Sequence, residues 1–321
     1  MTTMTTGEIN SISNEKLEMR NEKIISNSSF FTSNLIGTLA LEAMLVEVSV
    51  TPKPGLVDRN NSGAHRDMGF FTFIKSAAAL RDSFEEFAEA GENFEDSEIK
   101  NLFPIIRKIG VEAEKKMFAA TNGINTHKGE IFSLGLLSAA AGYLAAKKIL
   151  LTPDEIAKTA AKICYGICKK DFAGVHEKNK KFLTKGERVF IEHGITGVRG
   201  EAEAGYPVVI NVALPALKKY LSLNFNLNDA LAFTLIHIMA EANDTNIISR
   251  KNFATAEQVR QRAADLILNN KLCLEEIYKF DSDLISEYIS PGGAGDLLAV
   301  TYFLYILGEK FSANAPKNIK K

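Results

Sequence analysis

The chain has 321 residues, of which 46% are hydrophobic and 24% charged, and its formal net charge is −1. A charge this close to zero gives no global field that would favour nucleic acid or an anionic membrane, and the three cysteines, an odd number, argue against a disulfide framework. No uncharged apolar run of about 18 residues or more occurs and no secretory signal is visible, so we expect a cytoplasmic protein without a membrane span.

The N-terminal segment, 1–27, is rich in Thr, Ser, Asn and Glu and poor in apolar residues, so we expect a disordered tail. The fold is predicted to begin near Phe30. Apolar residues then recur at helical spacing toward a helix end near Val48, and again from Phe71 to Phe84. Alternating strand patterns are almost absent, and this absence favours an all-α protein.

Later in the chain, helix starts are marked by capping sequences at Thr152–Glu155 and Thr184–Glu187. A run of small residues, 135–146, would let neighbouring helices approach closely in the centre of a bundle. Pro104 and Pro215 mark a break or a kink. Further helices are predicted over 96–118, 129–149, 207–221, 228–241, 254–269, 272–288 and 293–307.

These elements predict one large all-α domain of roughly ten or more helices over residues 28–312, with polar inter-helix loops that form one cleft. A flexible C-terminal tail, 313–321, would follow it. No repeat of fixed period is visible, so a solenoid is not expected despite the number of helices.

Residues 47–67 form a polar loop between apolar helical segments. Pro52, Pro54 and Gly55 prevent helix continuation and fix the course of the chain, so the loop would present its side chains from a stiff support. The cations, carboxylates, histidine and amides that it gathers suit anion or metal binding. A solvated surface loop explains the segment equally well.

Residues 121–129 form a second polar block, directly before a predicted helix. Free backbone N–H groups at that helix start, with His127 and Lys128 beside them, would make a seat for phosphate. The alternative is an ordinary Asn or Thr cap with a solvated lysine. Because a cap accounts for a single Thr or Asn and not for the rest of the block, a functional role is favoured.

A third block, 194–205, places several glycines around Arg199, Glu201 and Glu203. Such a backbone is able to come very close to a ligand or to another segment. Arg199 would either contact substrate or pair with Glu203, and spacing leaves both open. No strand precedes the glycines, so they do not match a Walker or dinucleotide fingerprint.

Two further blocks, 241–252 and 290–296, complete the set. Asp244 and Asn246 offer the hard oxygen ligands that Mg²⁺ takes beside substrate phosphates. Asp244 follows an apolar helix, and the helix dipole disfavours a carboxylate at a C-terminus, so a cation would compensate it. The block at 290–296 opens the final helix, as a cap or as a second anion site.

Distinct motifs run through these blocks in a fixed order. They are Thr-Pro-Lys-Pro-Gly-Leu-Val-Asp-Arg at 51–59, Gly-Ala-His-Arg-Asp-Met at 63–68, Asn-Thr-His-Lys-Gly at 125–129, Gly-Val-Arg-Gly-Glu-Ala at 197–202, Asp-Thr-Asn at 244–246 and Ser-Pro-Gly-Gly-Ala-Gly-Asp-Leu-Leu-Ala at 290–299. Together they resemble the triphosphoribosyl-dephospho-CoA synthase family, from about residue 34 to residue 308. The chain departs from the family pattern at 250–252 and 293–296, and neither departure removes a charged group.

The resemblance implies transfer of the triphosphoribosyl unit of ATP to the ribose 2′-hydroxyl of 3′-dephospho-CoA, with release of adenine. The product would be the prosthetic-group precursor for the acyl carrier protein of citrate lyase, or of malonate decarboxylase, and would pass to a holo-acyl-carrier-protein transferase. Mg²⁺ would accompany the triphosphate. The sequence leaves the oligomeric state open, a homodimer included.

This reaction needs a carboxylate near the ribose and groups that transfer protons. Glu47 or Asp58 would be the carboxylate, and His65 or His127 the proton-transfer group, because an unperturbed histidine titrates near neutral pH. Asp67 or Glu201 would supply a second metal or ribose contact. The candidates for substrate and phosphate binding are Lys53, Arg59, Asn61, Asn125, Thr126, Lys128, Gly129, Arg199, Glu201, Arg250, Gly292 and Gly293, and those for metal are Asp67, Asp244 and Asn246.

Two other interpretations stay open. A Mg-dependent helical ADP-ribose or nucleotide hydrolase would also bring metal-binding carboxylates to a glycosidic centre, but would release adenine or sugar without dephospho-CoA. A non-catalytic helical scaffold would explain the apolar helices and leave the polar blocks as caps.

Overall fold

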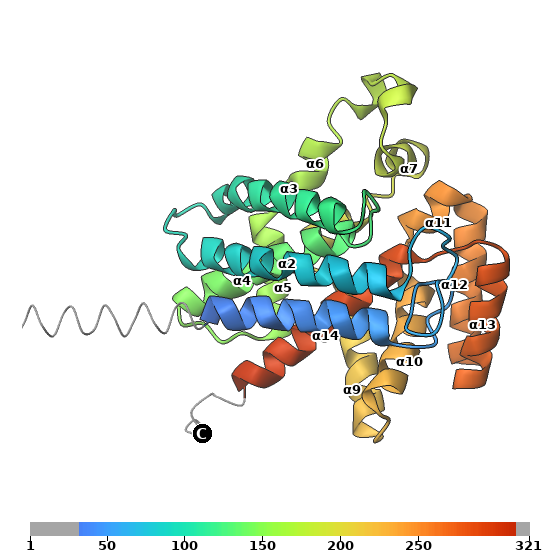
Figure 1. Cartoon of the computed structure of the whole chain (residues 1–321). Helices are drawn as coiled ribbons and strands as arrows, with labels where there is room; N and C mark the ends of the chain where they lie inside the picture. The colour runs from blue at the N-terminus through green and yellow to red at the C-terminus, as the bar shows by residue number, and fades with distance from the viewer. Residues whose placement is uncertain (1–31, 313–321) are drawn as a thin grey trace, which may run out of the picture.

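The computed structural model describes residues 32–312, and within that range every regular element is a helix (Figure 1). The predicted all-α fold is thereby confirmed. The predicted tails, 1–27 and 313–321, lie outside the described residues.

The first helix is described over residues 32–49, and a polar loop over 50–69 follows it. The later α-helices are α2 (Phe70–Glu92), α3 (Leu102–Ala120), α4 (Lys128–Ala146), α5 (Pro153–Ile163), α6 (Ile167–Asp171), α7 (Lys185–His193), α8 (Val198–Glu203), α9 (Leu214–Ser222), α10 (Leu227–Glu241), α11 (Thr245–Arg250), α12 (Phe253–Leu268), α13 (Leu274–Ser286) and α14 (Gly292–Ser312). Shorter 3₁₀ turns are η1 (Ile99–Asn101), η2 (Val175–Glu177) and η3 (Lys180–Phe182), and η4 (Val209–Ala213) is a π-helical turn.

Helix α4 packs against α2, α3, α5 and α14. It approaches α2 closely because glycine stands at the contact on both sides: a Cβ on Gly91 would lie 1.9 Å from the Ala139 carbonyl oxygen, and one on Gly142 would lie 2.0 Å from that of Ala88. The close approach predicted for 135–146 is therefore confirmed. Because these residues have no side chain or only a small one, the two backbones can pack densely without a clash.

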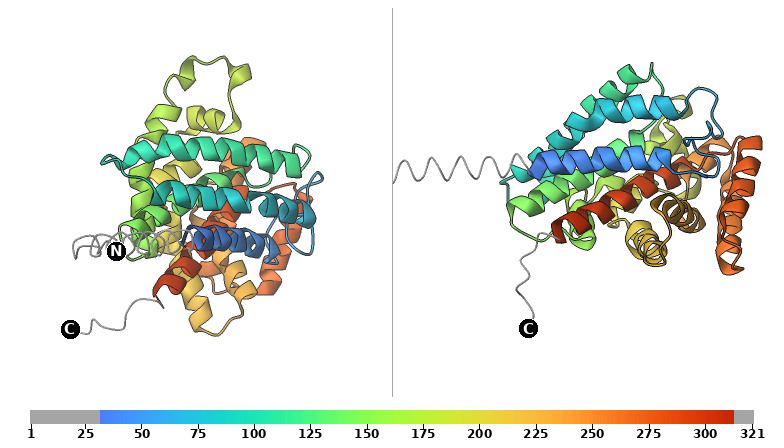
Figure 2. Two further views of the ribbon diagram at one scale, coloured as in Figure 1. Left: turned by 60° about the vertical axis from the view of Figure 1, so that its left-hand side comes forward. Right: turned by 60° about the horizontal axis from the view of Figure 1, so that its bottom comes forward.

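Helix α4 is apolar on all sides, a pattern typical of a helix surrounded by protein. Among residues 32–312 it alone is long and apolar enough to cross a membrane, and 72% of that stretch is buried inside the structure. Burial in the helical body accounts for its composition. A second group, in which α10 packs against α9, α12 and α14, joins the first through α14, since α14 also contacts α4 (Figure 2).

Both predicted capping sequences are confirmed. The Thr152 hydroxyl accepts from the Glu155 N–H at 3.2 Å, and Thr184 and Glu187 form a reciprocal capping box. Pro104 stands in the first turn of α3 and so does not kink a helix interior. Pro215 directly follows η4, and the backbone is helical on both sides of that turn, so the break predicted at Pro215 is a π-helical turn within one helical stretch over 207–222.

The short helices α6, α8 and α11 were not predicted, and α8 and α11 lie inside blocks expected to be loops. Helices of five or six residues are too short to show apolar periodicity. Helix α10 ends at Glu241, as predicted for the helix over 228–241. The expectation that Asp244 experiences the unfavourable dipole of a helix C-terminus is wrong, because Asp244 is the N-cap of α11.

Between α6 and α7 the chain projects from the helical body, as Figure 1 and the left view of Figure 2 show. This projection has a small apolar cluster of its own, formed by Phe172, Val175 and Leu183. At its base the chain returns through α7 to the glycine-rich block, and Asp171 and residues 194–197 line the same pocket.

Candidate active site

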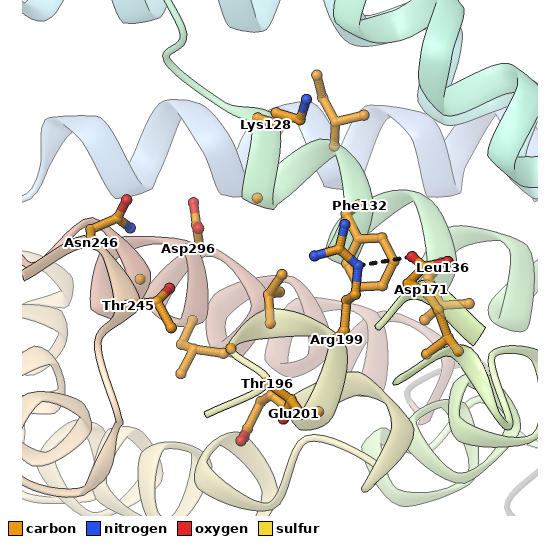
Figure 3. Close-up of a pocket in the computed structure, with 18 of the residues that line it drawn as sticks. Lys128, Phe132, Leu136, Asp171, Thr196, Arg199, Glu201, Thr245, Asn246 and Asp296 are labelled. Carbon is orange, nitrogen blue, oxygen red and sulfur yellow. Dashed lines mark hydrogen bonds and ion pairs between the residues drawn. The ribbon is translucent and has the colours of Figure 1, made fainter. Parts of the chain in front are cut away.

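Two adjoining pockets open where the polar blocks meet. The larger has a volume of about 630 Å³ and is bordered by α3, α4, α8 and the segment 194–197 (Figure 3). The smaller, about 120 Å³, is bordered by the end of the first helix, the polar loop and the starts of α4 and α14. Residues that line both pockets are Asn125, Lys128, Gly129, Asn246 and Asp296.

A buried ion pair stands in the wall of the smaller pocket. The side chains of Lys53 and Glu47 are 1% and 4% exposed, and Lys53 Nζ donates to Glu47 Oε1. Burial raises the pKa of Glu47, although Lys53 opposes the shift. Glu47 Oε2 has no hydrogen-bond partner among the described residues, so it is free to accept from a ligand.

Two more carboxyl groups, Glu130 of α4 and Asp296 of α14, line the smaller pocket with Glu47. Burial, and then the charge of Glu47, hold the pKa of Glu130 well above its ordinary value. Burial and the charges of Asp244 and Glu47 do the same for the pKa of Asp296. Carboxyl groups this close together cannot all ionise unless a cation compensates them, so the cluster holds a proton or attracts a cation.

His65 and Arg250 complete the smaller pocket. His65 Nε2 lies 2.9 Å from the Ser290 hydroxyl oxygen, and burial followed by the charge of Arg250 lowers the pKa of the imidazole. His65 is therefore neutral at physiological pH and able to accept or donate one hydrogen bond at the pocket. Asp67 is 65% exposed and does not line either pocket.

His127 is fully buried at the N-cap of α4 and lies outside the lining of both pockets. Its Nδ1 is 2.7 Å from the Ser76 hydroxyl oxygen. Burial, and then the charge of Lys53, lower the pKa of His127 to about 3. The imidazole is consequently neutral at physiological pH and orders the start of α4.

The start of α4 supplies residues that the two pockets share. The Asn125 side-chain oxygen accepts from the Lys128 N–H at 3.2 Å, and Lys128 Nζ reaches Glu114 at 2.7 Å. Gly129 lies against α14: a Cβ there would be 1.9 Å from Asp296 Oδ2. The absence of a side chain at this position is what lets the Asp296 carboxyl group reach the junction between the pockets.

Asp244 ties the starts of α11 and α14 together. Its Oδ1 accepts from the N–H groups of Asn246 at 2.8 Å and Ile247 at 3.1 Å, and its Oδ2 accepts from the Ala294 N–H at 3.0 Å. Burial raises the pKa of Asp244, and these bonds oppose the shift. Because the carboxylate stands at helix N-termini, the dipole stabilises it and the expected need for a compensating cation does not arise.

In the larger pocket, Arg199 Nε donates to Asp171 Oδ2 at 3.0 Å (Figure 3). The alternative pairing with Glu203 does not form, since Glu203 accepts instead from two backbone N–H groups near the start of α6. Glu201 accepts from the Val208 N–H at 2.8 Å, and burial raises its pKa.

The structure thus brings most predicted site residues into the pocket walls. The smaller pocket alone contains Glu47, Lys53, His65, Thr126, Arg250 and Gly292; the larger alone contains Arg199, Glu201, Asp244 and Gly293; both contain Asn125, Lys128, Gly129 and Asn246. Outside the lining of either pocket are Asp58, Arg59, Asn61, Asp67 and His127.

Two of these outlying residues shape the polar loop. Asp58 Oδ1 accepts from the N–H groups of Asn60 at 2.7 Å and Asn61 at 2.9 Å, and the Asn61 side chain donates to Asp281 Oδ2 at 3.2 Å. These bonds hold the turn that follows Lys53. Arg59 projects from this turn as an exposed side chain.

Within residues 32–312, no group of three or more His, Cys, Asp or Glu side chains is arranged to hold a metal ion. The oxygens of Asp244 are occupied by backbone N–H groups, whereas Glu47 Oε2 and Glu130 Oε2 are unpartnered there. Mg²⁺ is commonly bound by one or two carboxylates together with substrate phosphates. The donor set fits an ion that arrives with a nucleoside triphosphate better than a resident ion.

The charged residues Glu130, Asp296, Arg107 and Asp171 are among the residues of these walls that were not predicted. Glu130 and Asp296 are acidic residues near the starts of strongly apolar helices, a signal that could have identified them. Arg107 and Asp171 lie in ordinary charged stretches of sequence, and no local pattern distinguishes them.

A helical body whose buried carboxyl groups and cations surround two adjoining pockets defines an all-α enzyme for anionic substrates. The model of the ATP:dephospho-CoA triphosphoribosyl transferase family (CitG) matches residues 33–315. Since that match spans most of the chain, the protein belongs to this family.

Relatives of similar length support the same conclusion. An Escherichia fergusonii protein named 2-(5''-triphosphoribosyl)-3'-dephosphocoenzyme-A synthase is 38% identical over 89% of this chain and 96% of its own. Proteins of Vibrio cholerae serotype O1 and Citrobacter koseri carry that name with the qualifier "Probable". The Vibrio cholerae protein is 39% identical over 92% of this chain and 96% of its own. The Citrobacter koseri protein is 41% identical over 83% of this chain and 88% of its own.

Proposed function

We propose that the protein transfers the 5-triphosphoribosyl group of ATP to the 2′-hydroxyl of 3′-dephospho-CoA, forming 2′-(5″-triphosphoribosyl)-3′-dephospho-CoA and adenine. Membership of the family supports this reaction. The structural observation that supports it most is the pair of adjoining pockets, unequal in volume and sharing one set of residues. The reaction joins one atom of each substrate, so the two substrates need separate compartments that share a boundary where these atoms meet.

In this reaction the bond between C1′ and N9 of ATP breaks, and a bond between C1′ and the 2′-oxygen of dephospho-CoA forms. The 2′-hydroxyl loses a proton and the departing adenine gains one, so the reaction is balanced and the triphosphate stays on its ribose. Positive charge develops at C1′ in the transition state, and a nearby carboxylate stabilises it.

Asp296 is the carboxyl group best placed for this purpose, because among residues 32–312 it is the only acidic side chain that lines both pockets. We assign to it the contact with the ribose at C1′. Glu47 and Glu130, whose outer oxygens lack partners in the described chain, are placed to accept and return the proton. His65 remains the histidine predicted to assist, since it lines the smaller pocket.

The triphosphate needs local countercharge, because the chain as a whole has a net charge of −1. Arg250 and Lys128 line the smaller pocket, and Lys53 contributes its charge from within the wall. Mg²⁺ bound to the triphosphate would neutralise part of its charge. Glu47 or Glu130, each with an oxygen in the wall of the smaller pocket that is unpartnered among the described residues, would supply a carboxylate ligand to this ion.

Incubation of the purified protein with ATP, Mg²⁺ and 3′-dephospho-CoA, followed by chromatography of the products, tests this function. Adenine and the triphosphoribosylated product should appear in equal amounts, and only when dephospho-CoA is present. Adenine release without dephospho-CoA would instead identify a nucleotide hydrolase, and release of phosphate or ADP would identify an ATPase or kinase.

We further propose that the product passes to a holo-acyl-carrier-protein transferase that serves citrate lyase. A cytoplasmic location fits this role, because ATP and dephospho-CoA are cytoplasmic metabolites. A homodimer stays a prediction from the sequence.

A further inference from the structure

An ion network in the wall of the larger pocket has no part in the bond chemistry described above. Arg107 of α3 donates through two nitrogens to the two oxygens of Asp171, at 3.0 and 2.8 Å, and Arg199 of α8 donates through Nε to Asp171 Oδ2 at 3.0 Å. The side chain of Asp171 is only 12% exposed, compared with 46% for Arg107 and 39% for Arg199. A largely buried carboxylate therefore holds two more exposed guanidinium groups at the edge of the pocket.

The orientation of Arg199 follows from this network. Its Nε is engaged by Asp171, and no other hydrogen bond from Arg199 is found in the described part of the chain. Figure 3 shows its terminal nitrogens turned away from Asp171, toward the side of the pocket where Asp296 and Lys128 lie. Two parallel N–H donors in that position match the geometry of a phosphate group.

Apolar side chains surround the same site. The helices that carry the charges also carry apolar residues into the pocket wall, and α4 adds more from the opposite border. The wall combines an arginine fork with several apolar side chains, and the pocket, with a volume of about 630 Å³, has room for a long ligand. The apolar residues concerned are Phe103, Ile106, Phe132, Leu136, Ile167 and Val198.

We propose that the larger pocket binds 3′-dephospho-CoA, with the terminal nitrogens of Arg199 on its diphosphate and its pantetheine arm along the apolar wall. This assignment rests on the proposed function and deepens it. Asp171 and Arg107 are positioning residues. Asp171 accepts from Arg199, and Arg107 in turn holds Asp171, so the Arg199 guanidinium is fixed before substrate arrives. This arrangement reduces the entropy lost on binding.

The opposite arrangement, with ATP in the larger pocket, fits less well. Dephospho-CoA carries a diphosphate and a long, largely apolar arm, whereas ATP carries a triphosphate and no such arm. The smaller pocket, at about 120 Å³, is too small for the arm or for a whole nucleotide, but it can take the triphosphate end of ATP. Arg250 lines only this pocket and Lys128 lies at the shared boundary, so both can pair with the more highly charged group. Both ribose rings would then meet at the shared boundary beside Asp296.

Steady-state kinetics of the Asp171→Asn protein tests the assignment. The substitution keeps the size of the side chain and removes the charge that orients Arg199, so the KM for dephospho-CoA should rise roughly tenfold or more. The KM for ATP should change less than about twofold, and kcat less than about threefold. Arg107→Lys keeps the positive charge but loses one of two bonds to Asp171, and should give a smaller rise in the same KM.

Asp283→Asn is the matched control, because Asp283 also accepts from an arginine, Arg262, at 2.6 Å, but on the exposed surface and outside both pockets. Neither KM should change in this protein. A rise in the KM for ATP in Asp171→Asn would overturn the assignment in favour of ATP in the larger pocket. Unchanged KM values for both substrates would show that the network is purely structural and would also overturn it.

Calorimetric titration with dephospho-CoA in the absence of ATP separates this inference from the proposed function. Wild-type protein should bind dephospho-CoA, and Asp171→Asn protein with an unchanged circular dichroism spectrum should bind it roughly tenfold more weakly. Equal binding by both proteins would contradict the subsite even if the reaction occurs. Failure of the wild-type protein to release adenine would contradict the proposed function. The titration would still show whether dephospho-CoA binds in the larger pocket.

Discussion

Replacement of Gly129 by alanine perturbs the junction between the two pockets. A Cβ at this position would lie 1.9 Å from Asp296 Oδ2, 2.6 Å from Cγ and 3.0 Å from Oδ1. Because an unstrained contact between such atoms is about 3.5 Å, the carboxyl group must move by roughly 1.5 Å or rotate away from the junction. The flexible end of the side chain can yield, so the fold should survive.

A displacement of roughly 1 Å in a reacting group costs on the order of a hundredfold in rate. We therefore expect the kcat for adenine release by Gly129→Ala protein to fall by about that factor. The stability should change little, since alanine in a helix is about 0.5–1 kcal/mol more favourable than glycine and offsets part of the cost of moving Asp296. Chromatographic assay of adenine and thermal unfolding of the same preparation measure both quantities.

Gly186→Ala is the matched control, because Gly186 is also the second residue of an α-helix, α7, and no atom of the described chain lies within 4 Å of a Cβ built there. This protein should keep full activity. Wild-type kcat in Gly129→Ala protein would refute the assignment of Asp296 to the reacting ribose. A loss of activity that merely follows a loss of folded protein would refute the argument from displacement.

Three further predictions concern buried charges. Lys53→Met leaves Glu47 buried without its partner, and should lower the free energy of unfolding in urea by about 3–5 kcal/mol; a loss below about 1 kcal/mol would contradict this. Asp244→Asn should lower that free energy by about 1–3 kcal/mol through its lost cap bonds and leave the Mg²⁺ requirement for adenine release unchanged, whereas a changed requirement would support metal binding by Asp244. Burial raises the pKa of Asp281 to about 6 from 3.8, so its proton stabilises the folded state at acid pH and this contribution is lost as pH rises through about 6. Relative to Asp281→Asn protein, wild type should gain up to about 3 kcal/mol between about pH 8 and pH 4, and a pH-independent difference would be inconsistent with the raised pKa.

The parts of the fold that could be predicted are those that depend on local sequence. Thr152 and Thr184 start helices because their hydroxyl groups cap backbone N–H groups three residues away, an interaction that sequence spacing reveals. The helix at the small-residue run was also predictable, since a long apolar stretch without strand alternation has few other solutions. Helices α8 and α11 were not, because tertiary contacts rather than periodicity stabilise a helix of six residues.

The same division applies to the site. Polar blocks that interrupt apolar helices identified Glu47, Lys53 and the start of α4, and the structure places them in the pocket walls. The Arg107–Asp171 pair could not be predicted in this way, because 64 residues separate the partners and neither residue stands out from its local sequence. Only the folded chain brings them together. Roles that depend on neighbours, such as the neutral state of His127, likewise require the tertiary structure.

The arrangement of charge explains how a chain with a net charge of −1 can accommodate two polyanions. Several cations at the pockets are fixed by carboxylates, as Lys53 is by Glu47, Lys128 by Glu114 and Arg199 by Asp171, so their geometry is set before substrate binds. Each such carboxylate reduces the long-range attraction for phosphate but removes the cost of ordering a mobile side chain. The protein then distinguishes its two substrates by the fit of each anion to fixed cationic groups. A positive net charge, whose field would attract any polyanion, is not needed.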